Sequence, residues 1–132
     1  MAAHGAPVDP ALVFPGWGRR ETGLRAIDAA LDLPDPPTAA VCFNDVTAFG
    51  AMLGLYRRGL KPGQDFALVG CDDTLEASQW HPGLTSLRHT VPPGPVAADV
   101  LFQRLRDPRQ PQQRRAIAPL LIVRGTSQPP RA

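Results

Sequence analysis

The stretch "VCFNDVTAFGAML", residues 41–53, joins two kinds of secondary structure. It begins inside a short apolar run, 39–43, which is typical of a strand buried on both faces. Over 45–58 the apolar side chains recur at the spacing of a helix. The polar pair Asn44-Asp45 stands at the junction, where a carboxylate caps the free amides of a helix. We therefore expect Asp45 to be the helix cap.

A second stretch, "FALVGCDDTLEA" at 66–77, repeats this arrangement. The apolar run 66–70 predicts another buried strand, the acidic pair Asp72-Asp73 follows it, and 74–80 is compatible with a short helix. The start of a helix needs only one residue as its cap. Either Asp72 or Asp73 can cap this segment as Asp45 caps its helix, which leaves the other aspartate free to face a cleft.

The rest of the chain alternates in the same way. Further strands are expected at 11–14, 84–89 and 116–127, and further helices at 21–32 and 93–106. Strands that alternate with helices predict an α/β fold, a parallel sheet with helices on both faces. In such sheets ligands bind outside the carboxyl ends of the strands. Both polar pairs should therefore lie on one rim.

Composition narrows the functional classes. The chain has 132 residues, one domain by length, and its 14 basic and 12 acidic residues give a net charge of +2. The basic residues form no stripe, so nucleic-acid binding is not implied. No window approaches the ~18 apolar residues of a membrane span, and the start is not a secretory signal. We expect a cytoplasmic protein whose two cysteines, Cys42 and Cys71, are reduced.

Catalytic and metal-binding patterns are missing from the sequence. It contains no GxSxG elbow, no phosphate-binding glycine loop and no HExxH motif. Magnesium-dependent phosphoryl chemistry would need a lysine at the rim, but the one lysine, Lys61, lies in the turn that enters the strand at 66–70. His4, His81 and His89 show no ligand spacing with each other or with the cysteines. We expect no enzyme, no metal site and no cofactor.

A small-molecule site fits the rim better. The amide of Asn44 both donates and accepts hydrogen bonds, and the carboxylate of Asp72 or Asp73 only accepts, a pair that suits polyhydroxyl ligands such as sugars or nucleosides. Trp17 lies in a Gly-rich loop and is either a core residue or a platform on which a ring stacks.

Residues 36–89 carry a resemblance to a known family. The stretch resembles the C-terminal subdomain of the lac/gal repressor (LacI/GalR) family of transcription regulators, and the likeness extends over roughly 10–130. The closing "APLLIVRGTSQPP" resembles the last strand of that family. The matching elements are Pro37-Thr38-Ala39, Asn44-Asp45, Gly59-Leu60, Asp65 to Asp73, and Pro82 to Leu87.

The resemblance implies a type I periplasmic-binding-protein-like fold that binds a small effector, a sugar or a nucleoside, between two subdomains. It implies ligand contacts from Asn44 and Asp72, and a stacking contact from Trp17. Asp73, like Asp45, is then assigned mainly to capping and loop geometry. His89 stands where the family often has Gln and is a further candidate contact. A homodimer is possible, and a fragment of a solute-binding protein from a sugar transport system is the alternative.

The resemblance also implies how the chain is divided. We expect a disordered segment at 1–9, a partial effector-binding domain at 10–127 and a flexible tail at 128–132. The chain resembles the C-terminal remnant of a regulator, from a truncated gene or a late start codon. It shows no helix-turn-helix, hinge helix or N-terminal subdomain, so we expect no direct contact with DNA from this chain.

Overall fold

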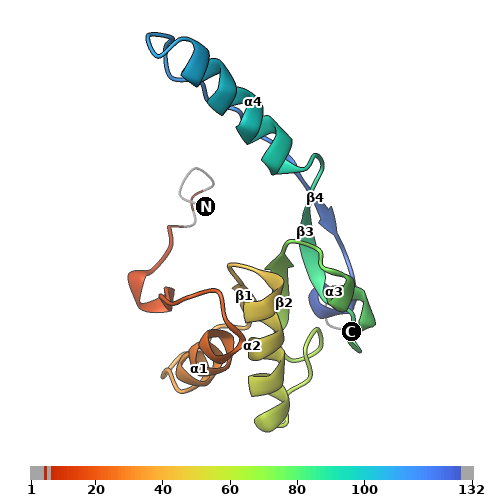
Figure 1. The fold of residues 1–132 in the computed structure, drawn as a ribbon. Helices are drawn as coiled ribbons and strands as arrows, with labels where there is room; N and C mark the ends of the chain where they lie inside the picture. Colours follow the sequence, from red (N-terminus) through yellow and green to blue (C-terminus); the bar gives the residue numbers. More distant parts are fainter. Residues whose placement is uncertain (1–4, 6, 129–132) are drawn as a thin grey trace.

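The computed structural model describes Gly5 and residues 7–128. Residues 1–4, 6 and 129–132, on which most of the predicted disordered segment and tail fall, lie outside the described residues. None of the described helices is long and apolar enough to cross a membrane. The elements, drawn in Figure 1, are η2 (Pro10–Leu12), α1 (Arg20–Leu31), β1 (Ala39–Val41), α2 (Asp45–Arg57), β2 (Ala67–Cys71), α3 (Leu75–Gln79), β3 (Thr85–His89), α4 (Pro93–Arg106), β4 (Pro119–Ile122) and η3 (Gly125–Ser127).

The strands form one sheet in the order β1-β2-β3-β4. β1 pairs with β2, and β2 with β3, in parallel, which confirms the predicted α/β fold class. β4 differs from the expected parallel arrangement because it is antiparallel to β3, with His89 opposite Pro119. The chain leaves the end of β3, runs out along α4 and re-enters the sheet at the same end. A connection that does not cross the sheet pairs its strands antiparallel.

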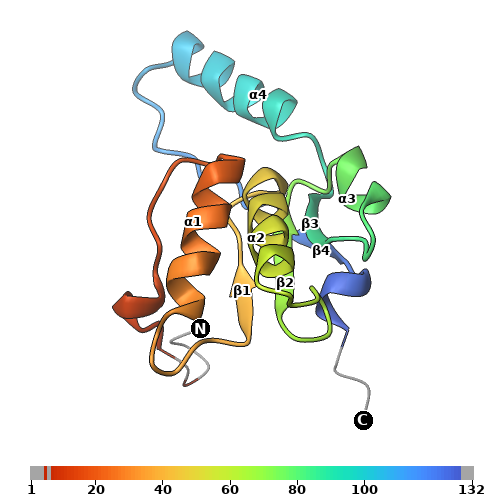
Figure 2. The same ribbon diagram turned by 90° about the horizontal axis from the view of Figure 1, so that it is seen from below.

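One face of the sheet carries the core. α2 packs on this face, α1 packs against α2, and α3 lies on the other side of α2 (Figure 2). Figure 2 also shows α4 apart from the other helices. The fully buried side chains at the centre of the core are Phe49, Met52, Leu55, Leu68 and Leu84. The Trp80 ring stacks on Phe49 with centroids 5.3 Å apart, which joins the end of α3 to α2.

The opposite face of the sheet is uncovered within the described residues. Its apolar side chains include Val41 and Val123, which are 77% and 63% exposed. α4 was expected to help cover the sheet, but it has no buried residue and projects away from the sheet in both views (Figures 1 and 2). The described helices therefore cover one face, where helices on both faces were expected.

Two local expectations are wrong. Residues 11–14 form no strand. Pro10–Leu12 is a 3₁₀ turn whose first amides are capped by Asp9, which accepts from Ala11 N at 2.9 Å. β1 was expected to be buried on both faces, but it lies at the edge of the sheet. Apolar composition gives no information on strand order, which decides whether a strand is central or at an edge.

The contact between α1 and α2 depends on two glycines. A Cβ atom at Gly23 would lie 1.8 Å from the backbone oxygen of Thr47, and one at Gly50 would lie 1.9 Å from the backbone oxygen of Arg20. Real Cβ atoms do not approach oxygen so closely, so the two helix backbones touch at these positions. Neither glycine has a left-handed backbone, so the close approach is the reason for glycine here.

Substitution of these glycines should separate the two helices. Gly50→Ala should destabilise the chain by about 1–3 kcal/mol because overpacking outweighs the ~1 kcal/mol gain in helix propensity. Gly94→Ala in α4 is the matched control, since a Cβ there meets nothing within 4 Å. Urea unfolding followed by circular dichroism measures both. Equal stability of the two variants would contradict the assignment of Gly50 to a backbone contact.

Candidate functional site

The polar residues predicted at the strand ends do share one rim. We use "the rim" for residues 43–45, which follow β1, and 71–74 at the end of β2, together with His89 at the end of β3. β1 and β2 are neighbours in the sheet, so the two polar pairs follow strands about 5 Å apart. The side chains at this rim divide into those held by the protein itself and those without internal partners.

Asn44, and not Asp45 as predicted, caps α2. Its side-chain oxygen accepts hydrogen bonds from Thr47 N at 2.9 Å and Thr47 Oγ1 at 2.7 Å. Its backbone is extended (φ −150°), as an N-cap requires, whereas Asp45 is already the first helical residue. The amide nitrogen donates to the Gly18 carbonyl at 3.2 Å. Since an amide nitrogen carries two hydrogens, one remains for another acceptor.

Asp45 is buried and acts as a link between elements. Its Oδ2 accepts from the backbone nitrogen of Thr74 at 2.7 Å and from the Thr74 hydroxyl at 3.0 Å. Its Oδ1 accepts from Ser86 Oγ at 2.5 Å. Gly70 makes room for this carboxylate, because a Cβ there would lie 2.3 Å from Oδ1. Asp45 thus links α2 to β3 and to the loop after β2, a role that differs from the predicted cap.

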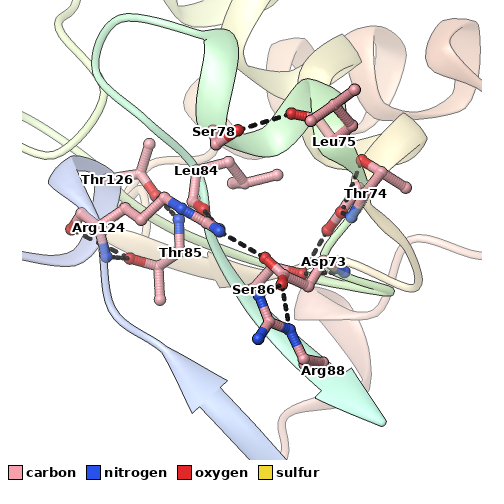
Figure 3. A network of polar contacts seen from close by, with 11 residues as sticks. Asp73, Thr74, Leu75, Ser78, Leu84, Thr85, Ser86, Arg88, Arg124 and Thr126 are labelled. Carbon is pink, nitrogen blue, oxygen red and sulfur yellow. Dashed lines mark hydrogen bonds and ion pairs between the residues drawn. The ribbon is translucent and has the colours of Figure 1, made fainter.

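Asp73 anchors a second polar network, shown in Figure 3. Its carboxylate accepts from Arg124 Nη2 at 2.6 Å and from Arg88 Nε at 2.5 Å, and its backbone nitrogen donates to Ser86 Oγ at 3.0 Å. The Asp73 side chain is 2% exposed. Burial acts to raise the pKa of this carboxyl, but the hydrogen bonds from Arg124 and Arg88 outweigh burial and hold the pKa below its ordinary value.

Arg124 was missed in the sequence as a partner of the rim. Besides Asp73, it donates to the Leu84 carbonyl at 2.8 Å, so it ties the chain after β4 to β3 and to the loop after β2 (Figure 3). The feature of the sequence that could have pointed to Arg124 is its position in the closing stretch "VRGTS". No spacing rule connects that position to Asp73, 51 residues earlier.

Asp72 and His89 are the exposed polar side chains of the rim. Among the described residues, neither makes a side-chain hydrogen bond. Asp72 also has a backbone φ of +117°, which is strained for a non-glycine residue. Cys71 precedes it. Burial, and next the charge of Asp72, raise the pKa of the Cys71 thiol. Because its side chain makes no hydrogen bond among the described residues, Asp72 is the rim carboxylate that remains available to a ligand.

Both cysteines are free thiols, as predicted. Cys42 packs against the core. Burial, and next the charge of Asp45, raise the pKa of Cys42 to about 11. Cys42 is therefore a protonated packing group, whereas Cys71 lies at the rim beside Asp72.

Two exposed aromatic residues, Trp17 and Phe43, are chain neighbours of Gly18 and Asn44, which lie in close contact. Trp17 is 80% exposed, which rules out the alternative of core packing. The loop that carries it passes close to the rim, because a Cβ at Gly18 would lie 2.7 Å from Asn44 Nδ2 and 3.0 Å from the Phe43 ring. Phe43 is also 80% exposed and was missed in the sequence, where its position directly before Asn44 was the available signal.

This arrangement of fold and rim can be compared with known proteins. The chain matches the family described as periplasmic binding protein-like domain over residues 1–127. The chain belongs to this family. The relatives among curated proteins are transcriptional repressors, and the similar structures are LacI-family regulators, which confirms the family resemblance found in the sequence.

Three similar proteins illustrate the match. The HTH-type transcriptional repressor CytR of Escherichia coli K12 is 32% identical over 126 residues, 93% of this chain and 36% of the repressor. The ribose operon repressor of the same organism is 36% identical over 106 residues, 80% of this chain and 32% of the repressor. The structure of a transcriptional regulator CelR–cellobiose complex is 28% identical with a TM-score of 0.78 and covers 95% of this chain and 38% of the regulator. The chain thus spans about a third of the length of these curated relatives.

Removal of the buried carboxylate should unfold the rim. Asp45→Ala leaves the Ser86 hydroxyl and the Thr74 amide without their acceptor, so we expect a loss of about 3 kcal/mol or more in unfolding free energy. Asp72→Asn is the matched control. It changes an exposed carboxylate one loop away and should stay within about 0.5 kcal/mol. Urea unfolding measures both. If Asp45→Ala lost no more unfolding free energy than Asp72→Asn, Asp45 would not be the residue that holds the rim together.

The ion pairs of Asp73 predict how stability depends on pH. Because the folded-state pKa lies below the unfolded value of about 3.9, the stabilisation is present above that value and is lost as the pH falls through the folded-state pKa. Asp73→Asn should therefore be less stable than wild type at neutral pH, and the difference should shrink on acidification towards pH 3. Melting temperatures at a series of pH values test this. A difference in melting temperature between wild type and Asp73→Asn that stays constant with pH would contradict the role of the two arginines.

Proposed function

We propose that this chain supplies one wall of the effector-binding cleft of a LacI-type transcription regulator, with a sugar or nucleoside as effector. The curated relatives named above are repressors, which supports regulation over solute transport and a binding role over catalysis. The similar regulator CelR forms a complex with cellobiose, which supports a sugar-like ligand. The proposal concerns the whole regulator, because the chain matches only part of each relative.

The observation that carries the proposal is the free carboxylate of Asp72 on the same rim as the spare amide hydrogen of Asn44. A carboxylate accepts hydrogen bonds from hydroxyl groups, and an amide hydrogen donates to a ring or hydroxyl oxygen. The other two rim carboxylates, Asp45 and Asp73, are occupied by internal donors. The rim therefore presents one charged acceptor and one donor to a ligand.

The exposed aromatic rings complete the chemistry of a sugar site. Trp17 and Phe43 directly precede Gly18 and Asn44, whose close contact joins the two segments, and both aromatic side chains are largely exposed. An apolar ring face beside a few directed polar groups is the usual composition of a small-molecule site. A pyranose, furanose or base ring offers an apolar face to such a ring and hydroxyl groups to Asp72. His89, exposed at the end of β3, is a further contact in this proposal.

The test needs the second wall that the family resemblance implies. Residues 10–127 are placed in the ribose operon repressor of Escherichia coli in exchange for the matching segment. The chimera is then titrated calorimetrically, in the presence of EDTA, with pentoses, cellobiose and ribonucleosides. For the ligand that binds, Asp72→Asn should weaken affinity about tenfold, because a charged acceptor is replaced by a neutral one. Asn44→Asp, which keeps the cap oxygen but removes the amide donor, should weaken it similarly.

The control for this test is Asp99→Asn, which removes an exposed carboxylate on α4, a helix that lies apart from the other helices (Figure 2). It should leave the affinity unchanged. Melting temperatures of all variants show that they remain folded. Normal binding by both Asp72→Asn and Asn44→Asp would place the effector site elsewhere, and failure of every sugar and nucleoside would overturn the proposed effector class.

A further inference from the structure

Three side chains of different chemistry meet at the end of β2 and β3. One ligand atom each from the Cys71 thiol, the Asp72 carboxylate and the His89 imidazole lie within 4.8 Å of one another. The strand pairing explains this, because Cys71 is opposite Leu87, and His89 follows two residues later on the same face of the sheet. The face that they share is the one left uncovered by helices.

The backbone of Asp72 brings the third group to this place. In a regular strand, successive side chains point to opposite faces, so Asp72 would point away from Cys71. The φ of +117° at Asp72 breaks this alternation, and its carboxylate lies with the thiol and the imidazole. The backbone nitrogen of Asp72 still donates to the Leu87 carbonyl at 2.9 Å, so the strained residue remains tied to β3.

We propose that Cys71, Asp72 and His89 form a three-ligand binding site for a transition-metal ion, with Zn²⁺ as the best match. Sulfur, imidazole nitrogen and carboxylate oxygen are the three donor types that Zn²⁺ accepts, whereas Mg²⁺ and Ca²⁺ prefer oxygen ligands. In a tetrahedral zinc site the ligand atoms are about 3.5 Å apart, from metal–ligand distances of about 2.0–2.3 Å. Small rotations of the exposed Asp72 and His89 side chains close the remaining distance.

The site has an open position. Three protein ligands leave the fourth position of a tetrahedral ion for water or for an oxygen of a small molecule. Neither Asp72 nor His89 gives up an internal side-chain hydrogen bond within the described residues, so metal binding disrupts no other contact of these groups. The inference does not rest on the proposed effector function, because the ion is bound by this chain's own residues alone.

The absence of a metal site was expected from the sequence, and the difference has a physical reason. Metal motifs are recognised by short spacings on one helix or loop, but His89 is 18 positions from Cys71 and belongs to the next strand. The parallel pairing of β2 with β3 makes them neighbours. Tertiary structure, and not local spacing, assembles these three ligands.

The test uses the full 132-residue chain in a reducing buffer. Calorimetric titration with Zn²⁺ should give one ion per chain, with a Kd of about 10 µM or below. Titration with Co²⁺ should add the intense near-ultraviolet absorption of a thiolate-to-cobalt charge transfer. Cys71→Ser should abolish that band, and His89→Gln and Asp72→Asn should each weaken zinc binding at least about tenfold, the loss expected when even a supporting group of a metal site is changed.

Matched controls use the other thiol and another imidazole. Cys42→Ala and His81→Gln should bind both ions as wild type does, since neither residue belongs to the cluster. Circular dichroism confirms that each variant is folded. The proposal is overturned if zinc binding is absent at millimolar concentration, if the charge-transfer band survives Cys71→Ser, or if His81→Gln weakens binding as much as His89→Gln.

Discussion

The buried carboxylate of Asp45 is the interaction on which the rest of the structure depends. It stands at the first turn of α2 and holds Thr74 in the loop after β2 and Ser86 in β3 by three hydrogen bonds. A charge removed from water is favourable only when it is fully hydrogen-bonded. The backbone must therefore bring these donors together, which sets where α2 begins and how the loop after β2 leaves the sheet. Gly70 belongs to the same constraint because it provides the space.

The polar residues of the rim have two different roles, since some are held by internal hydrogen bonds and others remain free. Asp45 and Asp73 are both saturated by internal donors, and the side-chain oxygen of Asn44 is used by the helix cap. Asp72 and His89 are left with free polar groups among the described residues. This leaves a compact set of binding groups on a rigid support, since the residues on either side are fixed by the two buried networks. The proposed effector site and the proposed metal site use the same exposed groups, so a bound ion and a bound effector would compete for Asp72 or share it.

The sequence by itself determined the type and the limits of most elements. The helical spacing of apolar residues predicted α1, α2 and α4 to within about a residue. An apolar run predicted β2 and alternation predicted β3, because periodicity and turn residues are local properties of the chain. Gly59 directly follows the end of α2, and its φ of +73° is the left-handed conformation that is typical of glycine after a helix. The shared rim followed from the alternation of strands and helices.

Only the tertiary structure decided the strand order, the direction of β4 and the partner of each rim residue. Asp45 was predicted as a cap and Asn44 as a free amide. Their roles are distributed differently because Thr74, Ser86 and Gly18 reach them from segments that are remote in sequence. The same holds for Arg124 with Asp73, and for His89 with Cys71. Hydrogen bonds and metal ligation act over a few ångströms in space, whatever the separation along the chain, so a sequence that specifies local structure well leaves such pairings to the fold.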